Sequence, residues 1–320
     1  MTTTFVPAAT NIPRAILSAC LATALFTVMG AIIKWLSPIY PLAEIIFARN
    51  LFALVPLAPL LLRAGPAAFK TRRPIGHALR CGIGLVSTAC SFTALDHLPL
   101  PNHVAITFTA PLFVTALAIP LLGEVVGWRR WLATVVGFAG VLIMVRPDGA
   151  AFLDNALFIG TLWGLAASFT YALVTIVMRQ LSSTEASLTT VAYFTLAGIL
   201  VSGAFLPFSF VMPTPRDAVL LALVGLLGGV GQVLITDAVR YGPTSIVAPF
   251  DYTGMLYALV IGWMVWSDVP STEVLVGAAV ITASGLFILH RETSLGVVRT
   301  RPAKLRTLTR GRHRGYRAGL

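Results

Sequence analysis

Charged residues are scarce in this 320-residue chain. Asp, Glu, Lys and Arg make up 11% of the sequence, and 57% of the residues are hydrophobic. Soluble domains contain about 25% charged residues, because a hydrated surface needs them. So few charges exclude soluble enzymes, secreted disulfide scaffolds and disordered proteins. The composition indicates a polytopic membrane protein.

Residues of the kinds that bind metals or cofactors are also sparse. The three cysteines, Cys20, Cys81 and Cys90, fall in apolar segments, where they are expected to be reduced packing residues. The glycine-rich run 225–231 lies inside an apolar segment with no preceding strand, which excludes a phosphate-binding loop. The sequence also contains no Cys-x-x-Cys pair, nucleophile elbow or ATP-binding motif. We therefore expect no cofactor, no metal and no enzymatic activity.

The formal net charge of +11 is concentrated at the end of the chain. Eight of the 23 basic residues lie in the last 22 positions. This tail has no apolar periodicity, and a basic tail beside a membrane is expected to rest on anionic lipid. A nucleic-acid-binding arm is the less favoured alternative, so we expect no nucleic-acid partner.

Apolar runs long enough to cross a bilayer recur along the chain. A membrane-spanning helix needs about 20 apolar residues. Breaking the sequence at proline, glycine and charge clusters predicts ten spans, at 14–35, 42–63, 77–96, 102–122, 128–146, 158–179, 187–210, 217–240, 244–266 and 272–290.

The distribution of basic residues between the loops predicts the orientation. If the amino terminus is cytoplasmic, 19 basic residues fall on the cytoplasmic side and three on the outer side, with Arg49 left inside a span. Cytoplasmic loops of membrane proteins carry an excess of Lys and Arg, so this asymmetry supports a cytoplasmic amino terminus. Both termini are therefore predicted to be cytoplasmic.

The two halves of the chain resemble each other. At an offset of 144 residues, Ala94 matches Ala238, Pro99 matches Pro243 and Thr109 matches Thr253. Five spans per half is an odd number, so the second half must enter the membrane upside down. The predicted fold is all-α, with ten transmembrane helices in two inverted five-helix repeats, 14–146 and 158–290. Residues 1–13 and 291–320 flank these repeats. Such repeats place a substrate site between the halves, near the midplane.

Proline interrupts corresponding spans of the two halves. Pro111 lies in span four and Pro249 in span nine, and each is expected to kink its helix and free a backbone carbonyl. In a bilayer the freed groups need partners, which favours a cavity wall and a role in gating. A kink needed only for packing is the alternative.

Two ionisable residues are predicted to reach the middle of the membrane. Arg49 and Asp251 each lie about seven residues into their span, or about 10 Å deep at 1.5 Å per residue. Buried ionisable groups are costly in a bilayer and mark functional sites. The two residues could form a mutual ion pair or divide a substrate site between the halves. Asn50 follows Arg49 and joins it as a candidate.

Other polar and aromatic residues complete a candidate site. Glu44 and His103 are candidates for gating or proton coupling, with a carboxylate at headgroup level and an exposed interfacial histidine as the alternatives. Asp237 lies three residues before Arg240, a spacing that predicts a local ion pair. For each aromatic candidate, packing is the alternative to stacking on a planar ligand. The substrate-binding candidates besides Arg49, Asn50 and Asp251 are Thr107, Thr109, Trp163, Tyr171, Gln232 and Tyr252.

Short motifs in both halves resemble a known family. The first half contains Asp96-His97-Leu98-Pro99-Leu100, Phe108-Thr109-Ala110-Pro111-Leu112-Phe113, Leu122-Gly123-Glu124, Arg130-Trp131, Gly137-Phe138-Ala139-Gly140 and Arg146-Pro147. The second half contains Pro249-Phe250-Asp251-Tyr252-Thr253, Gly262-Trp263 and Asp268-Val269-Pro270. Over about residues 14 to 292 the chain is similar to the EamA-type drug/metabolite transporters. The resemblance implies ten helices, a bacterial inner membrane and transport of a small metabolite.

The sequence thus predicts a secondary carrier for a small polar metabolite that works by alternating access. The resemblance and the aromatic content favour riboflavin-type vitamin uptake. Export of amino acids or other metabolites and S-adenosylmethionine transport are the alternatives within the family. A lipid-modifying membrane enzyme would need clustered acidic or metal-binding residues, and a channel fits the broken helices less well. The oligomeric state stays open, and a homodimer is compatible with the sequence.

Overall fold

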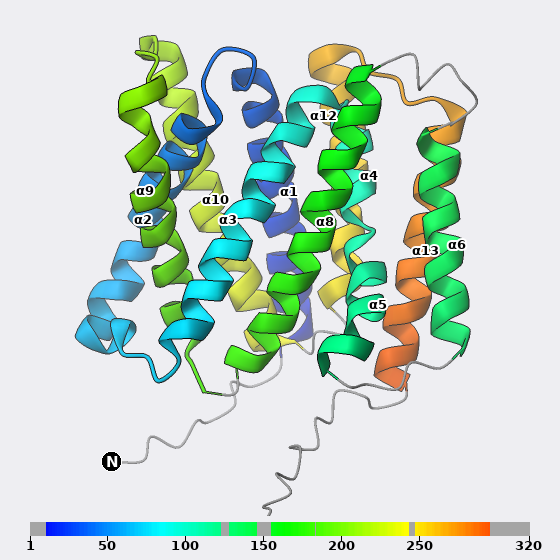
Figure 1. Ribbon diagram of the computed structural model, residues 1–320, viewed down its shortest axis with the longest axis horizontal. Coiled ribbons are helices and arrows are strands. Elements are labelled where there is room, and N and C mark those ends of the chain that lie inside the picture. The colour runs from blue at the N-terminus through cyan, green and yellow to red at the C-terminus, as the bar shows by residue number, and fades with distance from the viewer. Residues whose placement is uncertain (1–10, 123–127, 146–154, 183, 243–246, 295–320) are drawn as a thin grey trace, which may run out of the picture.

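The computed structural model describes residues 11–122, 128–145, 155–182, 184–242 and 247–294. Within these ranges the chain forms helices and the turns between them, and none of them contains a strand. Figure 1 shows the helices standing side by side in one bundle. The helices are α1 Ile12–Leu36, α2 Leu42–Ala64, η1 Gly65–Phe69, α3 Pro74–His97, α4 Leu100–Thr107, α5 Ala110–Leu122, α6 Trp128–Val145, α8 Asn155–Leu181, α9 Ser187–Ser209, α10 Pro215–Tyr241, η2 Ala248–Tyr252, α12 Thr253–Trp266 and α13 Thr272–Ser294.

Within the described ranges, seven helical segments are long and apolar enough to cross a membrane, which confirms the prediction of a multi-pass membrane protein. They span Ile12–Leu36, Leu42–Phe69, Pro74–His97, Leu100–Leu117, Ala156–Leu181, Ser187–Ser209 and Pro215–Tyr241. Two shorter apolar segments, Trp131–Ile143 and Thr272–Ile288, lie in α6 and α13.

The bundle has two faces where helices begin and end. The N-terminal face, at the bottom of Figure 1, holds the start of α1 and α3 and the end of α8 and α10. The opposite face holds the end of α1 and α3 and the start of α10. The most extensive helix pairs are α3 with α8, α1 with α10 and α6 with α13, followed by α2 with α10 and α9. In Figure 1, α6 and α13 stand together at one side of the bundle, with α2 and α9 at the other.

Prolines and polar caps fix where several helices begin. Pro13, Pro74 and Pro215 stand in the first turn of α1, α3 and α10, where a missing N–H is tolerated. The side chain of Asn11 accepts a hydrogen bond from the Arg14 N–H, and that of Thr214 accepts one from the Asp217 N–H. These caps satisfy helix donors that have no partner within the helix.

Both predicted proline breaks are present. The backbone changes from α4 to α5 at Phe108 and Thr109, just before Pro111, and Pro249 lies in the 3₁₀ turn η2 that precedes α12. The carbonyl of Ile106 at the first break accepts hydrogen bonds from the hydroxyl groups of Thr109, at 2.7 Å, and Ser168 of α8, at 3.0 Å. This carbonyl at the break is thus satisfied inside the protein, as a bilayer requires.

Glycines bring α2 and α10 into close contact. A Cβ on Gly225 would lie 2.8 Å from the carbonyl oxygen of Ala48, and one on Gly229 would lie 2.9 Å from that of Ala53. Small residues permit this approach between membrane helices, where close packing replaces the hydrophobic driving force. The main buried cluster lies beside this contact and includes Ile33, Leu36, Ile45, Phe92, Leu100 and Val224.

Candidate functional site

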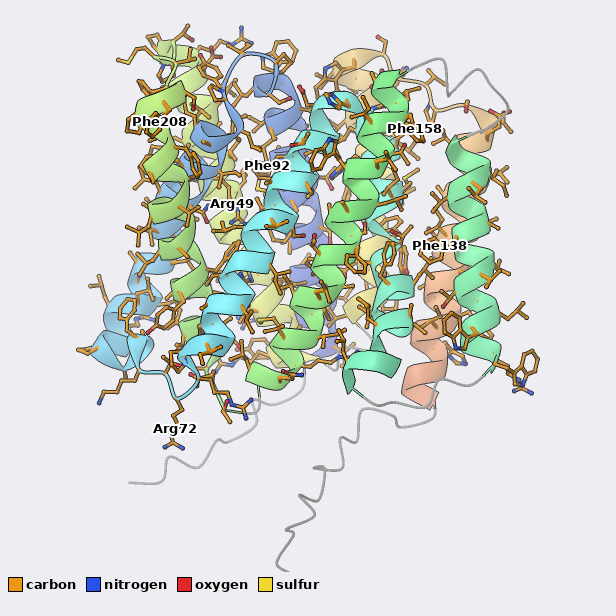
Figure 2. All side chains as sticks on the ribbon, in the orientation of Figure 1. Arg49, Arg72, Phe92, Phe138, Phe158 and Phe208 are labelled. Carbon is orange, nitrogen blue, oxygen red and sulfur yellow. The ribbon has the colours of Figure 1, made fainter. Side chains whose placement is uncertain are left out.

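Arg49 lies inside the bundle on α2, away from both faces. Figure 2 shows it in the interior, whereas Arg72 projects from the N-terminal face. The Nε atom of Arg49 is 3.6 Å from the Cβ position of Gly228 on α10, so the guanidinium packs against a helix with no side chain at that point. Its Nη1 donates a hydrogen bond of 3.1 Å to the side-chain oxygen of Asn50. Arg49 therefore lies at the contact between α2 and α10.

Asn50 holds Arg49 in place and has no surface left for a ligand. Its side chain is fully buried and also donates to the Ile46 carbonyl at 2.8 Å. It packs directly on Gly198 of α9, where any side chain would collide with it. The sequence predicted Asn50 as a substrate ligand, but in this conformation it serves as a positioning residue.

A second arginine, Arg80 of α3, joins Arg49 through a shared aromatic ring. The guanidinium carbon of Arg80 lies 3.9 Å from the centroid of the Phe194 ring, and that of Arg49 lies 5.6 Å from the same centroid. Phe194 belongs to α9 and packs against Gly84 of α3. Three helices therefore bring two positive charges to one ring.

Sequence reasoning missed both Arg80 and Phe194. Arg80 was counted among the 19 basic residues assigned to the cytoplasmic side. It lies instead on α3, with Nε and Nη1 buried. Its position inside the predicted span 77–96 was the available signal. Phe194 is one of 18 phenylalanines, and nothing in the sequence distinguishes it.

The predicted partner of Arg49, Asp251, does not form an ion pair with it in this structure. Ion pairs between described residues include Arg14 with Asp237, His77 with Glu185 and His97 with Asp96, and none involves Arg49. Asp251 lies on η2 with an exposed side chain. The two side chains therefore do not neutralise each other in this structure.

Tyr171 belongs to the inward face of α8. Gly164 on this helix packs against Ile106, and Ser168 donates to the Ile106 carbonyl. Tyr171 follows them at i+7 and i+3, spacings that keep it on the same side of the helix. Its side chain is nevertheless 58% exposed, so it borders open space rather than a packed core. Trp163, two turns earlier, is 41% exposed.

Three polar candidates make only local contacts. The Thr107 hydroxyl donates to the Val104 carbonyl, and the fully buried Thr109 donates to the Ile106 carbonyl at the break. Thr109 therefore satisfies the backbone and is not accessible to a ligand in this conformation. Gln232 is half-buried and lies one turn after Gly228 on α10. This spacing places it on the side of α10 that faces Arg49.

Tyr252 does not point toward Arg49. Its hydroxyl is directed at Gly285 of α13. Its ring packs on that of Phe108, with centroids 4.6 Å apart and an interplanar angle of 57°. Phe108 lies at the α4–α5 break and Tyr252 at the end of η2. The two broken segments therefore contact each other through aromatic rings.

Glu44 and His103 are both buried, so the exposed alternative for His103 is wrong. A carboxylate oxygen of Glu44 accepts a hydrogen bond of 3.1 Å from the Val211 N–H, while Oε1 is buried with no partner. His103 is 8% exposed, and its Nε2 lies 3.0 Å from the Ser91 hydroxyl. Both residues lie near the opposite face of the bundle.

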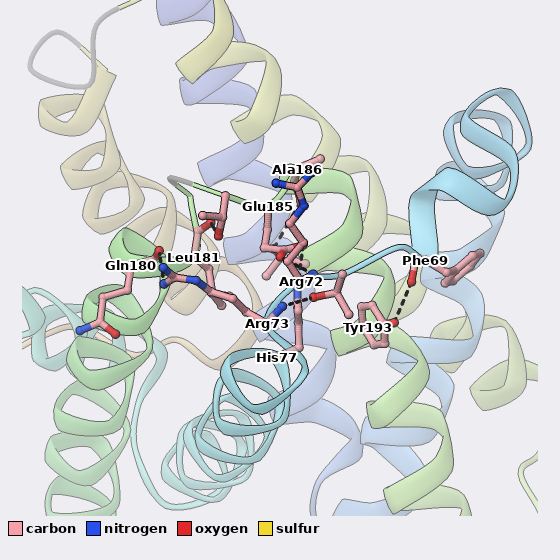
Figure 3. A network of polar contacts seen from close by, with 12 residues as sticks. Phe69, Arg72, Arg73, His77, Gln180, Leu181, Glu185, Ala186 and Tyr193 are labelled. Carbon is pink, nitrogen blue, oxygen red and sulfur yellow. Dashed lines mark hydrogen bonds and ion pairs between the residues drawn. The ribbon is translucent and has the colours of Figure 1, made fainter. Parts of the chain in front are cut away.

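A polar network closes the N-terminal face between α3 and α9. Figure 3 shows Glu185 beside the segment 72–77, with its Oε1 accepting a hydrogen bond of 2.9 Å from the Arg72 N–H. Its Oε2 lies 3.5 Å from the Nε2 of His77, whose ring packs on that of Tyr193. The hydrogen bond from Arg72 lowers the pKa of Glu185, and the contact with His77 lowers it further.

The opposite face has a comparable closure between α2 and α10. The hydroxyl of Tyr40 donates a hydrogen bond of 2.8 Å to Asp217, and the Thr214 N–H donates to the same hydroxyl. Desolvation raises the pKa of the Tyr40 hydroxyl, and its bond to Asp217 acts in the same direction. Polar contacts thus tie helices together at both ends of the bundle.

The local ion pair predicted between Asp237 and Arg240 is wrong. Asp237 pairs with Arg14 of α1, with Nη2 and Oδ2 3.0 Å apart. Arg14 also lies over the ring of Tyr241, 4.1 Å from its centroid. Because α1 packs closely on α10, Asp237 pairs with Arg14, which is far away in the sequence, and not with Arg240 on its own helix.

A groove of about 510 Å³ lies on α6 and α13, and neither Arg49 nor Arg80 lines it. Its lining is mostly apolar, with Arg129 as its charged member. Trp128 and Leu132 at this groove are 69% and 56% exposed. It opens on the side of the bundle formed by α6 and α13, so it does not contribute to the interior site.

Comparison with known proteins places this arrangement in a family. The model of the EamA-like transporter family matches residues 13–146 and again residues 158–290. The chain belongs to the EamA-like transporter family. This result confirms the resemblance inferred from the sequence motifs, and the family is one of transporters.

Curated relatives of this EamA-family transporter have different named substrates. A riboflavin transporter of Rhizobium johnstonii is 30% identical over 279 residues, covering 85% of this chain and 89% of the relative. An S-adenosylmethionine uptake transporter of Rickettsia prowazekii is 27% identical, with coverage of 78% and 83%. A pseudopaline exporter of Pseudomonas aeruginosa is 29% identical, with coverage of 84% and 93%.

A solved crystal structure shares the fold of this family member. It aligns with a TM-score of 0.60 at 16% identity and covers 87% of this chain and 98% of its own. At this identity the alignment supports the fold alone. The relatives establish small-molecule transport as the activity of such chains, and their names do not agree on a substrate or a direction.

Proposed function

We propose that this protein is a secondary transporter that moves a small polar metabolite across the bacterial inner membrane by alternating access. The observation that carries the proposal is the interior site, where Arg49, Arg80 and Phe194 come together from α2, α3 and α9. Charged and aromatic groups in the interior of a membrane bundle mark a path for a polar ligand. Membership in the family supports the same function.

We propose that ten spans form two inverted repeats, 14–146 and 158–290. The helix pairing supports this arrangement, because exchanging the halves turns the extensive pair α3 with α8 into the extensive pair α10 with α1. Phe108 and Tyr252, which pack on each other, are 144 residues apart, the offset of the repeat. Gly84 and Gly228 are also 144 residues apart, and they seat Phe194 and Arg49. Broken helices at a repeat interface are typical of secondary transporters.

We propose that the two states differ in the contacts of α2 and α9. In the structure α2 packs extensively along α10, whereas the corresponding pair, α9 with α3, has a smaller contact. Alternating access requires the two halves to exchange such contacts. The closures at Tyr40 and Glu185 lie in the loops that would separate. The buried, half-satisfied carboxylate of Glu44 is the candidate for proton coupling.

We propose that both termini are cytoplasmic. Arg63, Lys70, Arg72 and Arg73 lie at or beside the N-terminal face, which supports this orientation under the positive-inside tendency. We also propose that the basic tail, 291–320, binds anionic lipid. A homodimer stays a proposal, and crosslinking in native membranes at low protein density would test it.

Riboflavin is the first substrate to test, with S-adenosylmethionine and exported amino acids as the alternatives. Purified protein in liposomes should give saturable uptake and counterflow, which a carrier shows and a channel does not. Riboflavin import should also restore growth of a bacterial auxotroph that lacks its vitamin importer. Non-saturating flux would refute the carrier mechanism, and failed rescue with working counterflow of another solute would refute riboflavin.

Two variants test the site within this assay. Arg49→Ala and Asp251→Asn should each reduce transport strongly at matched protein levels, because each removes a charge that borders the interior path. Arg63→Gln, at the exposed end of α2, is the matched control and should transport normally. Full activity of both site variants would overturn the proposed location of the site.

A further inference from the structure

The interior of the bundle carries an unbalanced positive charge. Arg49 and Arg80 both lie over the ring of Phe194, at 5.6 and 3.9 Å from its centroid, and their charges repel each other. Of the side chains that the structure describes, none with a carboxylate forms an ion pair or hydrogen bond with either arginine. Among the described residues, the two cations therefore have no anionic partner.

The hydrogen-bond donors of these arginines are only partly satisfied. Nε of Arg49 and both Nε and Nη1 of Arg80 are buried without an acceptor, while each residue as a whole is half-buried. Each arginine thus keeps some exposed surface. Buried charges in proteins are normally paired, because an unpaired one has lost its hydration without compensation. The face of Phe194 offsets only a small part of this loss.

The local packing favours a ligand over a structural role. Gly84 and Gly228 let the two arginines and Phe194 pack closely on the helices, since a Cβ on Gly84 would meet Arg80 Nη1 and the Phe194 ring, each at 3.0 Å. Asn50 fixes one arginine through its side-chain oxygen, as a positioning residue does. The arginines themselves contribute no ion pair that would stabilise the empty protein.

We propose that Arg49 and Arg80 together bind an oxyanion of the transported molecule, a carboxylate or a phosphate, and that Phe194 packs against its planar part. Guanidinium groups bind such anions through charge-assisted, often bidentate hydrogen bonds. The aromatic ring at their centre suits a substrate whose anionic group is attached to a flat ring or chain. This inference deepens the proposed function and rests on it, since it names the substrate class as organic anions.

Binding of matched ligands to the purified transporter tests the charge requirement. Thermal stabilisation is measured in detergent at constant ionic strength with pairs that share a skeleton and differ in charge. Suitable pairs are riboflavin 5′-phosphate with riboflavin, benzoate with benzamide, glutamate with glutamine, and succinate with succinamide. We expect at least one anionic member to stabilise the protein more than its neutral counterpart. Phosphate and carboxylate pairs distinguish the two anion types.

Variants assign the effect to the two arginines. Arg80→Gln and Arg49→Gln should weaken binding of that anion about 10–100-fold, the effect of losing a hydrogen bond to a charged group. Arg80→Lys should retain part of the affinity, because it keeps the charge and loses the bidentate geometry. Arg63→Gln should bind as the unmodified protein does.

The empty protein gives a second, independent readout. Because the two charges repel and lack a partner, Arg80→Met should raise the melting temperature without ligand by about 2–4 °C while abolishing anion binding. A structural arginine would show the opposite change, with lower stability in every variant. Equal stabilisation by neutral and anionic members, no stabilisation by any anion, or loss of stability in Arg80→Met and Arg80→Lys would each overturn the inference.

These measurements separate the inference from the proposed function. They record binding in detergent, and they need no membrane gradient or vesicle. Saturable counterflow of a neutral solute with no anion binding would support the transport proposal and refute the anion site. Anion binding without counterflow would support the anion site and refute the transport proposal.

Discussion

The ring of Phe108 packs on that of Tyr252, with centroids 4.6 Å apart, and joins the two segments where helices of the bundle are broken. Each ring lies beside a proline, Pro111 or Pro249, that prevents a continuous helix. The sequence predicted the two breaks without showing that they meet. Their contact places the least regular backbone of the chain in the middle of the bundle, where other helices can satisfy it.

The aromatic contact should couple the two breaks energetically, and removing either ring should reveal this coupling. We expect Phe108→Ala and Tyr252→Ala to lower the free energy of unfolding, and the double variant to lose about 0.5–1.5 kcal/mol less than the sum, the usual worth of an aromatic pair. Denaturant unfolding in mild detergent gives the values. Phe208→Ala, at a side chain that is 85% exposed, is the control and should change little. Strict additivity would show that the rings do not interact.

Adding a methyl group at Gly225 should disrupt the contact of α2 with α10. The new Cβ would lie 2.8 Å from the Ala48 carbonyl oxygen and 3.0 Å from the Ala53 nitrogen, and backbone atoms cannot turn aside. We expect Gly225→Ala to cost about 1–3 kcal/mol, as overpacking does. Gly82→Ala on α3 is the matched control, because a Cβ there meets nothing within 4 Å. Equal melting temperatures for both variants would contradict the close packing.

The Glu185 network should make the closure of the N-terminal face sensitive to acid. The Arg72 N–H and His77 lower the pKa of Glu185 in the folded protein. A lowered folded pKa means that the carboxylate stabilises the fold above the ordinary Glu pKa of about 4.3, and that this stabilisation is lost as the pH falls through the lower folded value.

Glu185→Gln tests this dependence. The variant should melt at a lower temperature at pH 7, and its melting temperature should fall less than that of the unmodified protein between pH 5 and pH 3. Thr184→Ala, at the neighbouring residue, serves as a control for the same loop. Parallel melting curves for Glu185→Gln and the unmodified protein across this range would contradict the assigned contacts.

The ion pair between Arg14 and Asp237 should contribute little to stability. The side chains are 52% and 23% exposed, so water screens much of the attraction over their separation of 3.0 Å. Exposed pairs contribute about 0–1 kcal/mol. A double-mutant cycle of Arg14→Gln and Asp237→Asn should give a coupling energy within that range, and it should shrink in high salt. A coupling of several kcal/mol would show that the pair is shielded from water.

Much of the fold was predictable because membrane helices follow local rules. Apolar runs of sufficient length, interrupted by charged loops, predicted an all-helical multi-pass protein, and the structure confirms it. Pro111 and Pro249 indicated the breaks because proline acts on its own helix. The ten spans and their inverted repeats stay predictions, since seven segments meet the length and hydropathy requirement for a membrane span.

The candidate site was less predictable because it depends on contacts between helices. Arg49 and Asp251 were identified because a charge in an apolar run is visible in the sequence. Their similar predicted depth in the membrane did not determine whether they pair with each other. The structure instead brings Arg49 and Arg80 to the ring of Phe194. Similarly, the i, i+3 spacing of Asp237 and Arg240 was overridden when α10 packed on α1.

The sequence by itself determined the class, the helices, the breaks and the family of this protein, because each follows from hydrophobicity, proline chemistry or short motifs along the chain. Only the tertiary structure decided which side chains meet. Arg49, Arg80 and Phe194 are separated by 31 and 114 residues, and glycines on neighbouring helices seat the arginine and the ring. The scarcity of charge identifies the bilayer as the solvent. The packing of α2, α3 and α9 gathers two of those few charges at one ring.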